Sequence, residues 1–225
     1  MSGIRLDLHV HSVASPDSRA TIEEVADAAA NAGLHGFALT DHNSIFGWQW
    51  ISRIRERFPR LLVVPGVEVS TREGHLLVYG VSQLPPLRRP LEETVEWVER
   101  HGGVSVLAHP LRFAHGVGAA LARRARVHAI ESLNGHNSEV TNARAELIAA
   151  HRAIGTTGGS DAHDGLSVGR AFTEFPEEPG SVDEVLQSIR RSRIHGAGRS
   201  LAPGERFRLG LRTGLLRAAR GFRPI

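Results

Sequence analysis

The chain has 225 residues, enough for one large domain with a full hydrophobic core. It contains no cysteine, which excludes disulfide bonds, thiolate nucleophiles and cysteine-based zinc sites. All 27 basic residues are arginine, and residues 190–225 hold ten of them against one acidic residue, a net charge of +9 compared with −6 for residues 1–189. This asymmetry indicates an anionic partner or substrate near the C-terminus.

The first residues lack the basic and apolar regions of a signal peptide, and no apolar run approaches the roughly 18 residues of a membrane span. We therefore expect a cytoplasmic protein without a membrane span. The sequence leaves the oligomeric state open.

Short apolar runs alternate with helical patterns along the chain. Residues 21–33 predict a helix, because Thr21 stands at the cap position, Glu24 follows three residues later and a glycine ends the run. Strands are predicted at 4–10, 36–42, 61–70, 75–81 (a hairpin strand), 103–110 and 127–135, and further helices at 91–102, before Arg126 and at 141–155. These units predict a mainly parallel sheet with helices outside, either a barrel or a doubly wound sheet, and a proline-rich loop at 82–90.

Polar side chains gather where the predicted strands end. They are His9 and His11, Asp41 and His42, Glu68, His109, and Asp161 with His163. His9 and His11 share one face of their strand, because residues i and i+2 of a strand point the same way. A lone histidine would be a structural residue, but clusters at three strand ends in a chain without cysteine predict a metal site on the active face of a barrel.

Seven blocks carry a family resemblance. They are "DLHVHS", "SPDS", "TDHN", "PGVEVST", "EGHLLVYG", "AHP" and "GGSDAH", in this order between residues 4 and 175. With them the chain resembles the PHP family, the polymerase and histidinol phosphatase superfamily of metal-dependent phosphoesterases, and most closely its small stand-alone bacterial members. The resemblance implies a distorted (β/α)7, TIM-like barrel with two to three divalent metal ions.

The resemblance also implies a ligand set. By motif, the first metal would be bound by His9, His11, Glu68 and Asp161, with Glu68 bridging to a second metal held by His75 and His109, and a third would be completed by Asp17, His42 and His163. The carboxylate of Asp17 could instead cap the following helix. Imidazole and carboxylate ligands suit zinc, manganese or iron(II) and do not choose among them.

The residue chemistry agrees with hydrolysis of a phosphate ester. A bridging carboxylate such as Glu68 could hold two ions roughly 3.5 Å apart, and water between them would lose a proton and attack phosphorus as a metal-bound hydroxide. Asp41 would orient a ligand or accept a proton rather than bind metal. Glu131 and Asn134 are expected at the active face, where either would orient a ligand, contact substrate or cap a helix.

Arginine can grip phosphate through two parallel hydrogen bonds. Arg112 ranks first as a substrate contact, followed by Arg170 and then Arg19; the alternative for each is a surface ion pair. His115 and His136 could protonate a leaving group, but a solvated loop position is the expectation for both.

The sequence thus predicts a barrel at 1–196 and a basic extension at 197–225 packed on or beside it. The expected function is hydrolysis of a small phosphomonoester such as a nucleotide or sugar phosphate. One alternative is a nuclease or nucleotide phosphodiesterase that recruits oligonucleotides through the basic C-terminus. Another is a non-catalytic accessory module, which the complete ligand set disfavours.

Overall fold

The structure is a computed structural model that describes residues 3–202 and 204–205. Its strands are β1 (Ile4–Val10), β2 (Gly36–Leu39), β3 (Leu62–Ser70), β4 (His75–Tyr79), β5 (Val104–Leu107), β6 (Ala129–Asn134), β7 (Gly155–Gly159), β8 (Ala171–Phe175) and β9 (His195–Gly198). Its helices are α1 (Ile22–Asn31), the 3-10 helix η1 (Phe46–Trp50), α2 (Ile51–Arg57), α3 (Leu91–Arg100), α4 (Ala119–Ala122), α5 (Glu139–Arg152) and α6 (Val182–Arg190).

The strands pair in the order β7-β6-β5-β4-β3-β2-β1-β8-β9. Four of these pairings are parallel (β1–β2, β2–β3, β5–β6 and β6–β7) and four are antiparallel. The expectation of a mainly parallel sheet was therefore wrong. The turn between β3 and β4 is too short for a crossover helix, so β4 returns antiparallel to β3, as the hairpin prediction required.

The sheet curls until its ends nearly meet, which confirms the predicted barrel-like architecture. Just beyond β7, the amide of Asp161 donates to the carbonyl of His9 (2.7 Å), and the amide of His11 donates to the carbonyl of Ala162 (2.9 Å). Further down, β7 packs on β8 through Gly158, where a Cβ atom would lie 2.1 Å from the carbonyl oxygen of Phe172. Glycine is required there because the two backbones approach too closely for any side chain.

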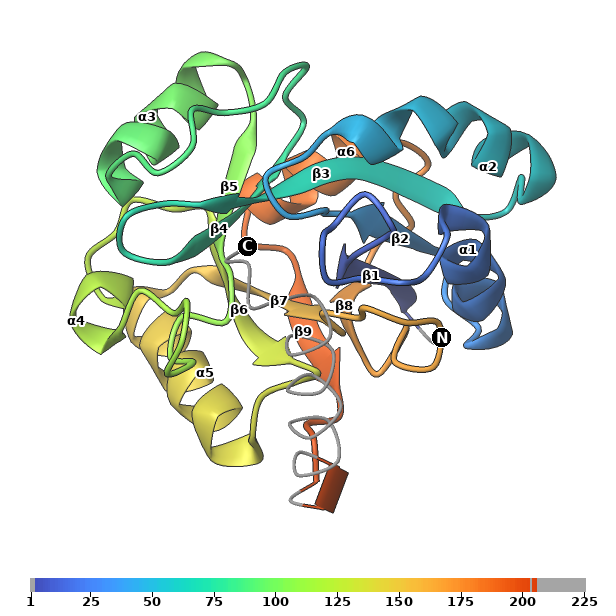
Figure 1. Cartoon of the computed structure of the whole chain (residues 1–225). Helices are drawn as coiled ribbons and strands as arrows, with labels where there is room; N and C mark the ends of the chain where they lie inside the picture. Colours follow the sequence, from blue (N-terminus) through green and yellow to red (C-terminus); the bar gives the residue numbers. More distant parts are fainter. Residues whose placement is uncertain (1–2, 203, 206–225) are drawn as a thin grey trace.

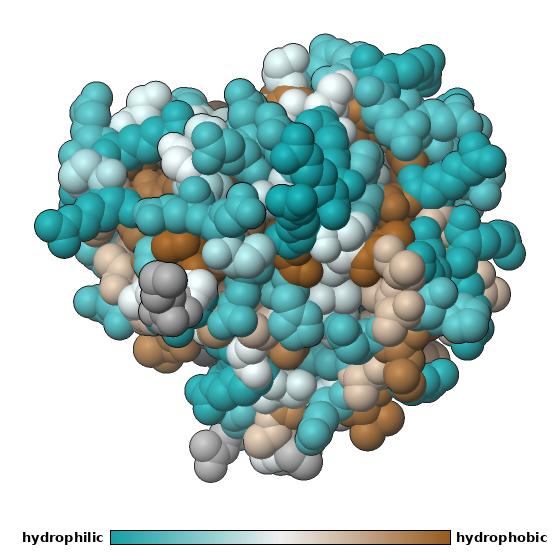
Figure 2. All heavy atoms as spheres, turned by 180° about the vertical axis from the view of Figure 1, so that it is seen from behind, coloured by the Kyte–Doolittle hydropathy of each residue, from teal (hydrophilic) through white to brown (hydrophobic). Residues whose placement is uncertain are grey.

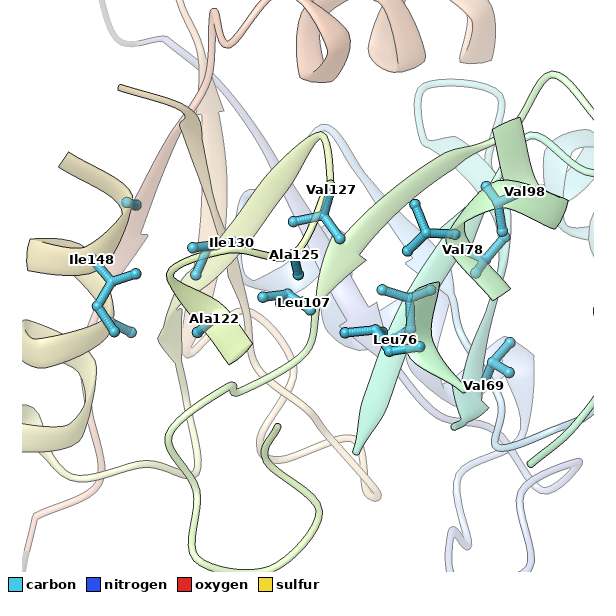
Figure 3. Packing of buried hydrophobic residues seen from close by; sticks show 14 of the residues in the cluster. Val69, Leu76, Val78, Val98, Leu107, Ala122, Ala125, Val127, Ile130 and Ile148 are labelled. Atoms are coloured by element: carbon cyan, nitrogen blue, oxygen red, sulfur yellow. The ribbon is translucent and has the colours of Figure 1, made fainter. Parts of the chain in front are cut away.

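Helices α1 to α5 lie outside the curled sheet (Figure 1). Figure 3 shows part of the outer core, in which Leu76, Leu107 and Ile130 from the strands face the surrounding helices, with Val98 on α3 and Ile148 on α5. A second outer core joins α1 and α2 to the strands β1 to β3. The helices therefore hold the barrel from outside and leave its carboxyl-terminal mouth to loops.

The barrel interior is apolar toward its other end. Tyr79 is fully buried there, and its hydroxyl donates to the carbonyl of Leu8 (2.6 Å) on the opposite wall. Helix α6 covers this end, with Leu186 packed against Gly80 after β4. The interior polar groups are thus left to the carboxyl ends of the parallel strands.

Several local predictions can be compared with the structure. The capping box of α1 is confirmed, since Thr21 accepts from the amide of Glu24 while the Glu24 carboxylate accepts from the amide of Thr21. Helix α4 ends at Ala122 rather than near Arg126, and α5 ends at Arg152 rather than at residue 155. The sequence did not predict η1, α2, β8, α6 or β9. The loop at 82–90 is confirmed and is hydrogen-bonded to the β3–β4 turn through Arg88 and Arg89.

The C-terminal part of the described chain belongs to the barrel, because β9 runs through Gly198 and Leu201 is buried. Most of the predicted basic extension, residue 203 and residues 206–225, lies outside the described residues. In the described part, no helix combines the length and the hydropathy that a membrane crossing demands. Seen from behind, the surface is mostly hydrophilic with separate hydrophobic patches (Figure 2).

Barrel closure can be tested at Gly158. A methyl group at this position meets the Phe172 carbonyl and cannot be accommodated by a side-chain rotation, so Gly158→Ala should lower the free energy of unfolding by about 3 kcal/mol or more, the upper end of overpacking costs. Urea denaturation measures the change. Gly165→Ala is the control, because a Cβ there makes only ordinary contacts at 3.8 Å; equal effects of the two variants would contradict the closure argument.

Candidate metal centre

All nine predicted ligands lie at one mouth of the barrel. His9, Glu68 and the residues after β1, β2, β5 and β7 reach this mouth from the carboxyl ends of strands. His75 reaches it from the first residue of β4, because β4 runs antiparallel to both β3 and β5 and so begins where they end. The nine are His9, His11, Asp17, His42, Glu68, His75, His109, Asp161 and His163.

Glu68 is the centre of the cluster and is fully buried. Its Oε2 atom lies 3.1 Å from His9 Nε2, 3.3 Å from His11 Nε2 and 3.1 Å from His42 Nδ1. Its Oε1 atom lies 2.7 Å from His75 Nδ1 and 2.9 Å from His109 Nε2. The two oxygens of one carboxylate therefore face two separate groups of imidazoles, as a bridging ligand would.

The contacts around Glu68 Oε2 are close but are not hydrogen bonds. The Oε2 atom itself, His9 Nε2, His11 Nε2 and His42 Nδ1 are all buried without a hydrogen-bond partner. Each such atom costs about 1–3 kcal/mol when it is left unsatisfied. A divalent cation would satisfy all four together, because imidazole nitrogens and carboxylate oxygens are ligands of transition metals, so the donor set fits the implied metal.

Ser15 and Asp41 fix the orientation of His11. Ser15 Oγ donates to Asp41 Oδ1 (2.9 Å), which leaves it to accept from His11 Nδ1–H (3.0 Å) and from the amide of His42 (2.9 Å). His11 Nδ1 therefore carries a proton, so Nε2, which faces Glu68 and Asp161, is the nitrogen that would bind a cation once it is deprotonated.

Asp41 stands behind His11 and does not face the open mouth. Its two oxygens accept from the amide (2.7 Å) and hydroxyl (2.9 Å) of Ser12 as well as from Ser15. The geometry supports the orienting role that the sequence offered for Asp41, and it leaves both oxygens occupied by protein donors.

Glu131 fixes the orientation of His9, as Ser15 fixes that of His11, by accepting a hydrogen bond from its Nδ1 atom. Glu131 Oε1 accepts from His9 Nδ1 (2.8 Å), and Glu131 Oε2 accepts from the amide of His109 (2.7 Å) and from Asn134 Nδ2 (3.0 Å). One carboxylate on β6 thus positions a histidine from β1 and another from β5. This arrangement matches the ligand-orienting alternative for Glu131.

Asp17 lies beside two of the histidines assigned with it. Its Oδ2 atom is 3.1 Å from His163 Nε2 and 3.7 Å from His42 Nε2, while Oδ1 is buried without a hydrogen-bond partner. The capping alternative is wrong, because Thr21 caps α1. His163 Nδ1 donates to the carbonyl of Asp161 (2.8 Å), which directs Nε2 at Asp17.

Two of the predicted ligands hold unusual backbone conformations. His109 has φ 28° and Asp161 has φ 57°, both in the left-handed region that residues with a Cβ atom seldom adopt. Such strain persists where surrounding contacts over-determine it and is common at functional sites. Here the Asp161 amide is tied to β1 and the His109 amide to Glu131.

The carboxylates of the cluster are held ionised. Burial alone would raise the pKa of Glu68, but His42, His75 and His9 keep it well below its usual range. Burial likewise opposes ionisation of Asp161, yet His9 and Arg112 keep its pKa well below the ordinary value. For Asp17 the burial effect is outweighed by His163, and its pKa falls to about 2. These three carboxylates are therefore anionic at neutral pH.

The histidines divide into two groups. Burial lowers the pKa of His42 to about 3 and that of His109 to about 4, so both are neutral at pH 7. Burial also opposes charge on His11, but the Asp161 and Glu68 carboxylates beside it raise its pKa to about 9. The pKa of His9 lies well above its ordinary value because Glu131, Asp161 and Glu68 outweigh burial. Without a bound cation, His9 and His11 carry the protons.

Arg112 is joined directly to the cluster. Its Nη2 donates to Asp161 Oδ2 (2.7 Å) and Asn134 Oδ1 (2.6 Å), and its Nε donates to Asn137 Oδ1 (3.1 Å). The sequence offered a surface ion pair as the alternative role of Arg112. Arg112 does form an ion pair, but with Asp161, which is a buried residue of the site. Arg112 stays partly exposed, so it lies at the edge of the cluster.

The remaining candidates are less central. Arg170 pairs with Glu205 (2.9 Å), and Arg19 is exposed with its amide bonded to the carbonyl of His163. The ring of His115 stacks on His75 at 4.7 Å. His136, expected in a solvated loop, is instead grouped with Asp161 and His163, and burial lowers its pKa to about 3.

Sequence reasoning missed two loop residues, Ser15 and Asn137. Ser15 contacts the predicted ligand His11, and Asn137 contacts the predicted substrate-binding residue Arg112. Ser15 stands in the "SPDS" block, but the sequence does not show that its hydroxyl reaches both His11 and Asp41. A hydroxyl with three partners becomes visible only when the β1 and β2 loops are placed side by side.

A barrel whose mouth gathers imidazoles and ionised carboxylates around one shared carboxylate has the arrangement of a site for divalent metal ions. The chain belongs to the PHP family: the PHP domain profile matches residues 7–107, and the PHP-associated profile matches residues 140–194.

Similar proteins carry related names. The chain is 24% identical to a "Probable phosphatase" of Shewanella sediminis over 218 residues, covering 77% of this chain and 87% of the relative. It is 37% identical over 86 residues to a phosphoribosyl 1,2-cyclic phosphate 1,2-diphosphodiesterase of Eggerthella lenta, covering 36% of this chain and 32% of the relative. The second match thus spans only about a third of that relative's length.

Two solved structures share the fold. PsfC from Pseudomonas syringae superposes with a TM-score of 0.72 at 21% identity, covering 97% of this chain and 99% of PsfC. The lesion-specific endonuclease EndoQ from Pyrococcus furiosus superposes with a TM-score of 0.65 at 18% identity, covering 89% of this chain and 59% of EndoQ. At these identities the likeness shows the fold alone.

The role of Ser15 can be measured. Ser15→Ala frees His11 Nδ1 from its acceptor and should weaken binding of Zn²⁺ or Mn²⁺ by about 10- to 100-fold, the usual effect of removing a group that orients a ligand. Isothermal titration calorimetry on protein stripped by chelator gives the affinity. Ser188→Ala on α6 is the control, and an unchanged affinity in Ser15→Ala would refute the orienting role.

Metal binding should release protons. Because the pKa of His11 is about 9 and that of His9 is also raised, both are protonated at pH 7 and must lose a proton to bind a cation. Affinity should therefore rise with pH between 6 and 9, with about two protons released per chain near pH 7. Calorimetry in buffers of different ionisation enthalpy counts them. Release of none would show that the two histidines are already neutral.

Proposed function

We propose that this protein is a metal-dependent phosphoric ester hydrolase that acts on a small phosphomonoester. The observation that carries the proposal is Glu68, whose two oxygens face five histidine nitrogens at 2.7–3.3 Å in a buried site. The names of the phosphatase and phosphodiesterase relatives support a phosphate ester as substrate.

The chain's own residues would prepare the site for this reaction. Divalent ions bound there would supply Lewis-acid activation of water and of the phosphoryl group. Glu68 would bridge two of them, Ser15 and Glu131 would hold His11 and His9 in the binding tautomer, and the ionised carboxylates would offset the cationic charge.

Arg112 would bind the phosphoryl group. Its bonds to Asp161, Asn134 and Asn137 use three of the five N–H donors of a guanidinium. Among the described residues no further hydrogen bond of Arg112 is seen, so its other two N–H donors would be available to a phosphate oxygen. Asp161 would thereby couple the arginine to the metal site, since the same carboxylate contacts His9 and His11 through its other oxygen.

The ligand assignment predicts a ranking of variants. Glu68→Gln should reduce kcat/KM by more than the about 10- to 100-fold that loss of an orienting group costs, because this carboxylate faces two groups of histidines. Asp17→Asn should cost less, because Asp17 faces only His163 and His42 at the edge. Steady-state kinetics with metal analysis of each variant decide the order; a greater loss in Asp17→Asn would overturn the partition.

A substrate panel tests the function itself. Phosphomonoesters, cyclic phosphates and short oligonucleotides should be assayed with added Zn²⁺, Mn²⁺ and Fe²⁺, with chelator as the negative control. We expect chelation to abolish phosphate release from a monoester. No hydrolysis of any ester with any metal would count against the proposal.

The same panel tests recruitment of oligonucleotides by the basic C-terminus. A chain that ends after Glu205 keeps β9, the buried Leu201 and the Glu205–Arg170 pair, and it removes six arginines. Monoester turnover should survive this truncation. A selective loss of oligonucleotide hydrolysis would instead favour the nuclease alternative.

A further inference from the structure

Helix α5 carries apolar residues on its outer side as well as on its inner side. The inner side joins the outer core through Ala145, Ile148 and Ala149, which are buried. Seven large hydrophobic residues are exposed in the described chain, and two of them lie on α5: Val140, which is 70% exposed, and Leu147, which is 69% exposed. The other five lie in loops or in η1, so α5 is the one α-helix of the described chain that exposes large hydrophobic residues.

The exposed apolar residues of α5 form a continuous stripe. Four of them are spaced by three or four positions, which places them along one side of the helix. They are Val140, Ala143, Leu147 and Ala150, here called the α5 stripe. By the same helical geometry, Glu139 and Glu146 lie along one edge of the stripe, and Arg144 and His151 lie along the other. Because α5 lies outside the curled sheet (Figure 1), the stripe faces away from the barrel.

The described chain ends beside the first turn of α5. Asn142 Nδ2 donates to Ser200 Oγ (2.9 Å), and the amide of Leu201 donates to the carbonyl of Asn137 (3.1 Å), just before the helix. Residues 206–225 follow from this point. A helix of 14 residues is about 21 Å long, and an extended chain spans about 3.3 Å per residue, so this segment is long enough to reach every part of the α5 stripe.

The sequence of residues 206–225 matches the α5 stripe in pattern and in charge. Five of its apolar residues recur at intervals of four, four, three and four positions, the spacing of one face of a helix. They are Phe207, Leu211, Leu215, Ala218 and Phe222. The segment holds six arginines and no acidic residue, a charge of +6, whereas residues 1–205 hold 21 arginines and 24 acidic residues, a charge of −3. Opposite charges therefore favour contact between the segment and the rest of the chain.

We propose that the apolar residues of segment 207–222 pack on the α5 stripe and hold the basic C-terminus on the outside of the barrel. Arginines beside the stripe would pair with Glu139 and Glu146. The observations favour this segment over a second copy of the chain, because one helix stripe is small compared with specific interfaces, which bury about 1,200–2,000 Å² in total. A segment of the same chain needs less area, because the covalent connection keeps it at a high effective concentration.

The test compares stability in two chain lengths. Leu147→Gln is made in the full chain and in the chain that ends after Glu205, and urea midpoints are measured with and without the substitution. In the full chain it should lower the midpoint by about 0.5–1 M, because a covered leucine is lost. In the shorter chain it should change the midpoint little, because Leu147 is then exposed.

Leu166→Gln is the matched control. It replaces a leucine that is 91% exposed outside the helices, and it should change the midpoint of neither chain length. An equal loss from Leu147→Gln in both chain lengths, or no loss in either, overturns the proposal.

Dependence on protein concentration distinguishes the segment from a second copy. Packing within one chain gives a urea midpoint that does not change with concentration, whereas packing between copies gives a midpoint that rises with it. We expect the full chain to show a constant midpoint over two orders of magnitude in concentration. A rising midpoint, with dimers in sedimentation, would assign the α5 stripe to a second copy and overturn the proposal.

The absence of cysteine allows a direct check of proximity. A full chain with Leu147→Cys and Leu215→Cys should form an internal cross-link with a short bismaleimide. A full chain with Leu87→Cys and Leu215→Cys is the control, because Leu87 lies in the loop at 82–90, and it should not form one. Failure of the first pair, or equal cross-linking of both pairs, would show that the segment does not rest on α5.

Discussion

The mutual compensation of buried charges at the barrel mouth is the constraint on which the site depends. Glu68 and Asp161 lie in an environment that opposes ionisation, and they stay ionised because imidazoles and Arg112 surround them. The same carboxylates hold protons on His9 and His11. Isolated charges would be too costly to bury, so the ligands are stable only as a group. A cation that replaces these protons would preserve the charge balance and satisfy the unpaired nitrogens.

The group in turn depends on the curvature of the sheet. His9 lies in β1 and His11 follows it, while Asp161 follows β7. In the strand order, β7 stands at one end of the sheet, and β1 stands near the other end, followed only by β8 and β9. Only closure brings them together, and it does so through hydrogen bonds made by the backbone of His9, His11 and Asp161 themselves. The glycine contact between β7 and β8 supports the same closure from below. Backbone packing and ligand geometry are therefore one property of the fold.

Much of the candidate site was predictable because its residue types are rare at strand ends. Histidines spaced i and i+2, an Asp-His pair and a glutamate at the end of an apolar strand stand out in a sequence without cysteine. The supporting residues were harder to predict, because serine and asparagine are common in loops and turns. Ser15 and Asn137 gain their roles from contacts with residues far along the chain or across a loop. Likewise, the sequence could not decide whether Asp17 caps the following helix or binds metal, and only the structure shows that Thr21 caps α1.

The sequence by itself determined the local elements, because the capping box of α1 and the hairpin strand β4 are readable from short-range patterns. Short-range patterns also picked out polar residues at the strand ends, and the family resemblance implied the full set of nine ligands. Only the tertiary structure decided the half-antiparallel sheet, the two-sided surroundings of Glu68 and the attachment of Arg112 to Asp161. The reason is physical. Propensity and periodicity act over a few residues, whereas hydrogen bonds and charge compensation across a barrel depend on how distant strands are brought side by side.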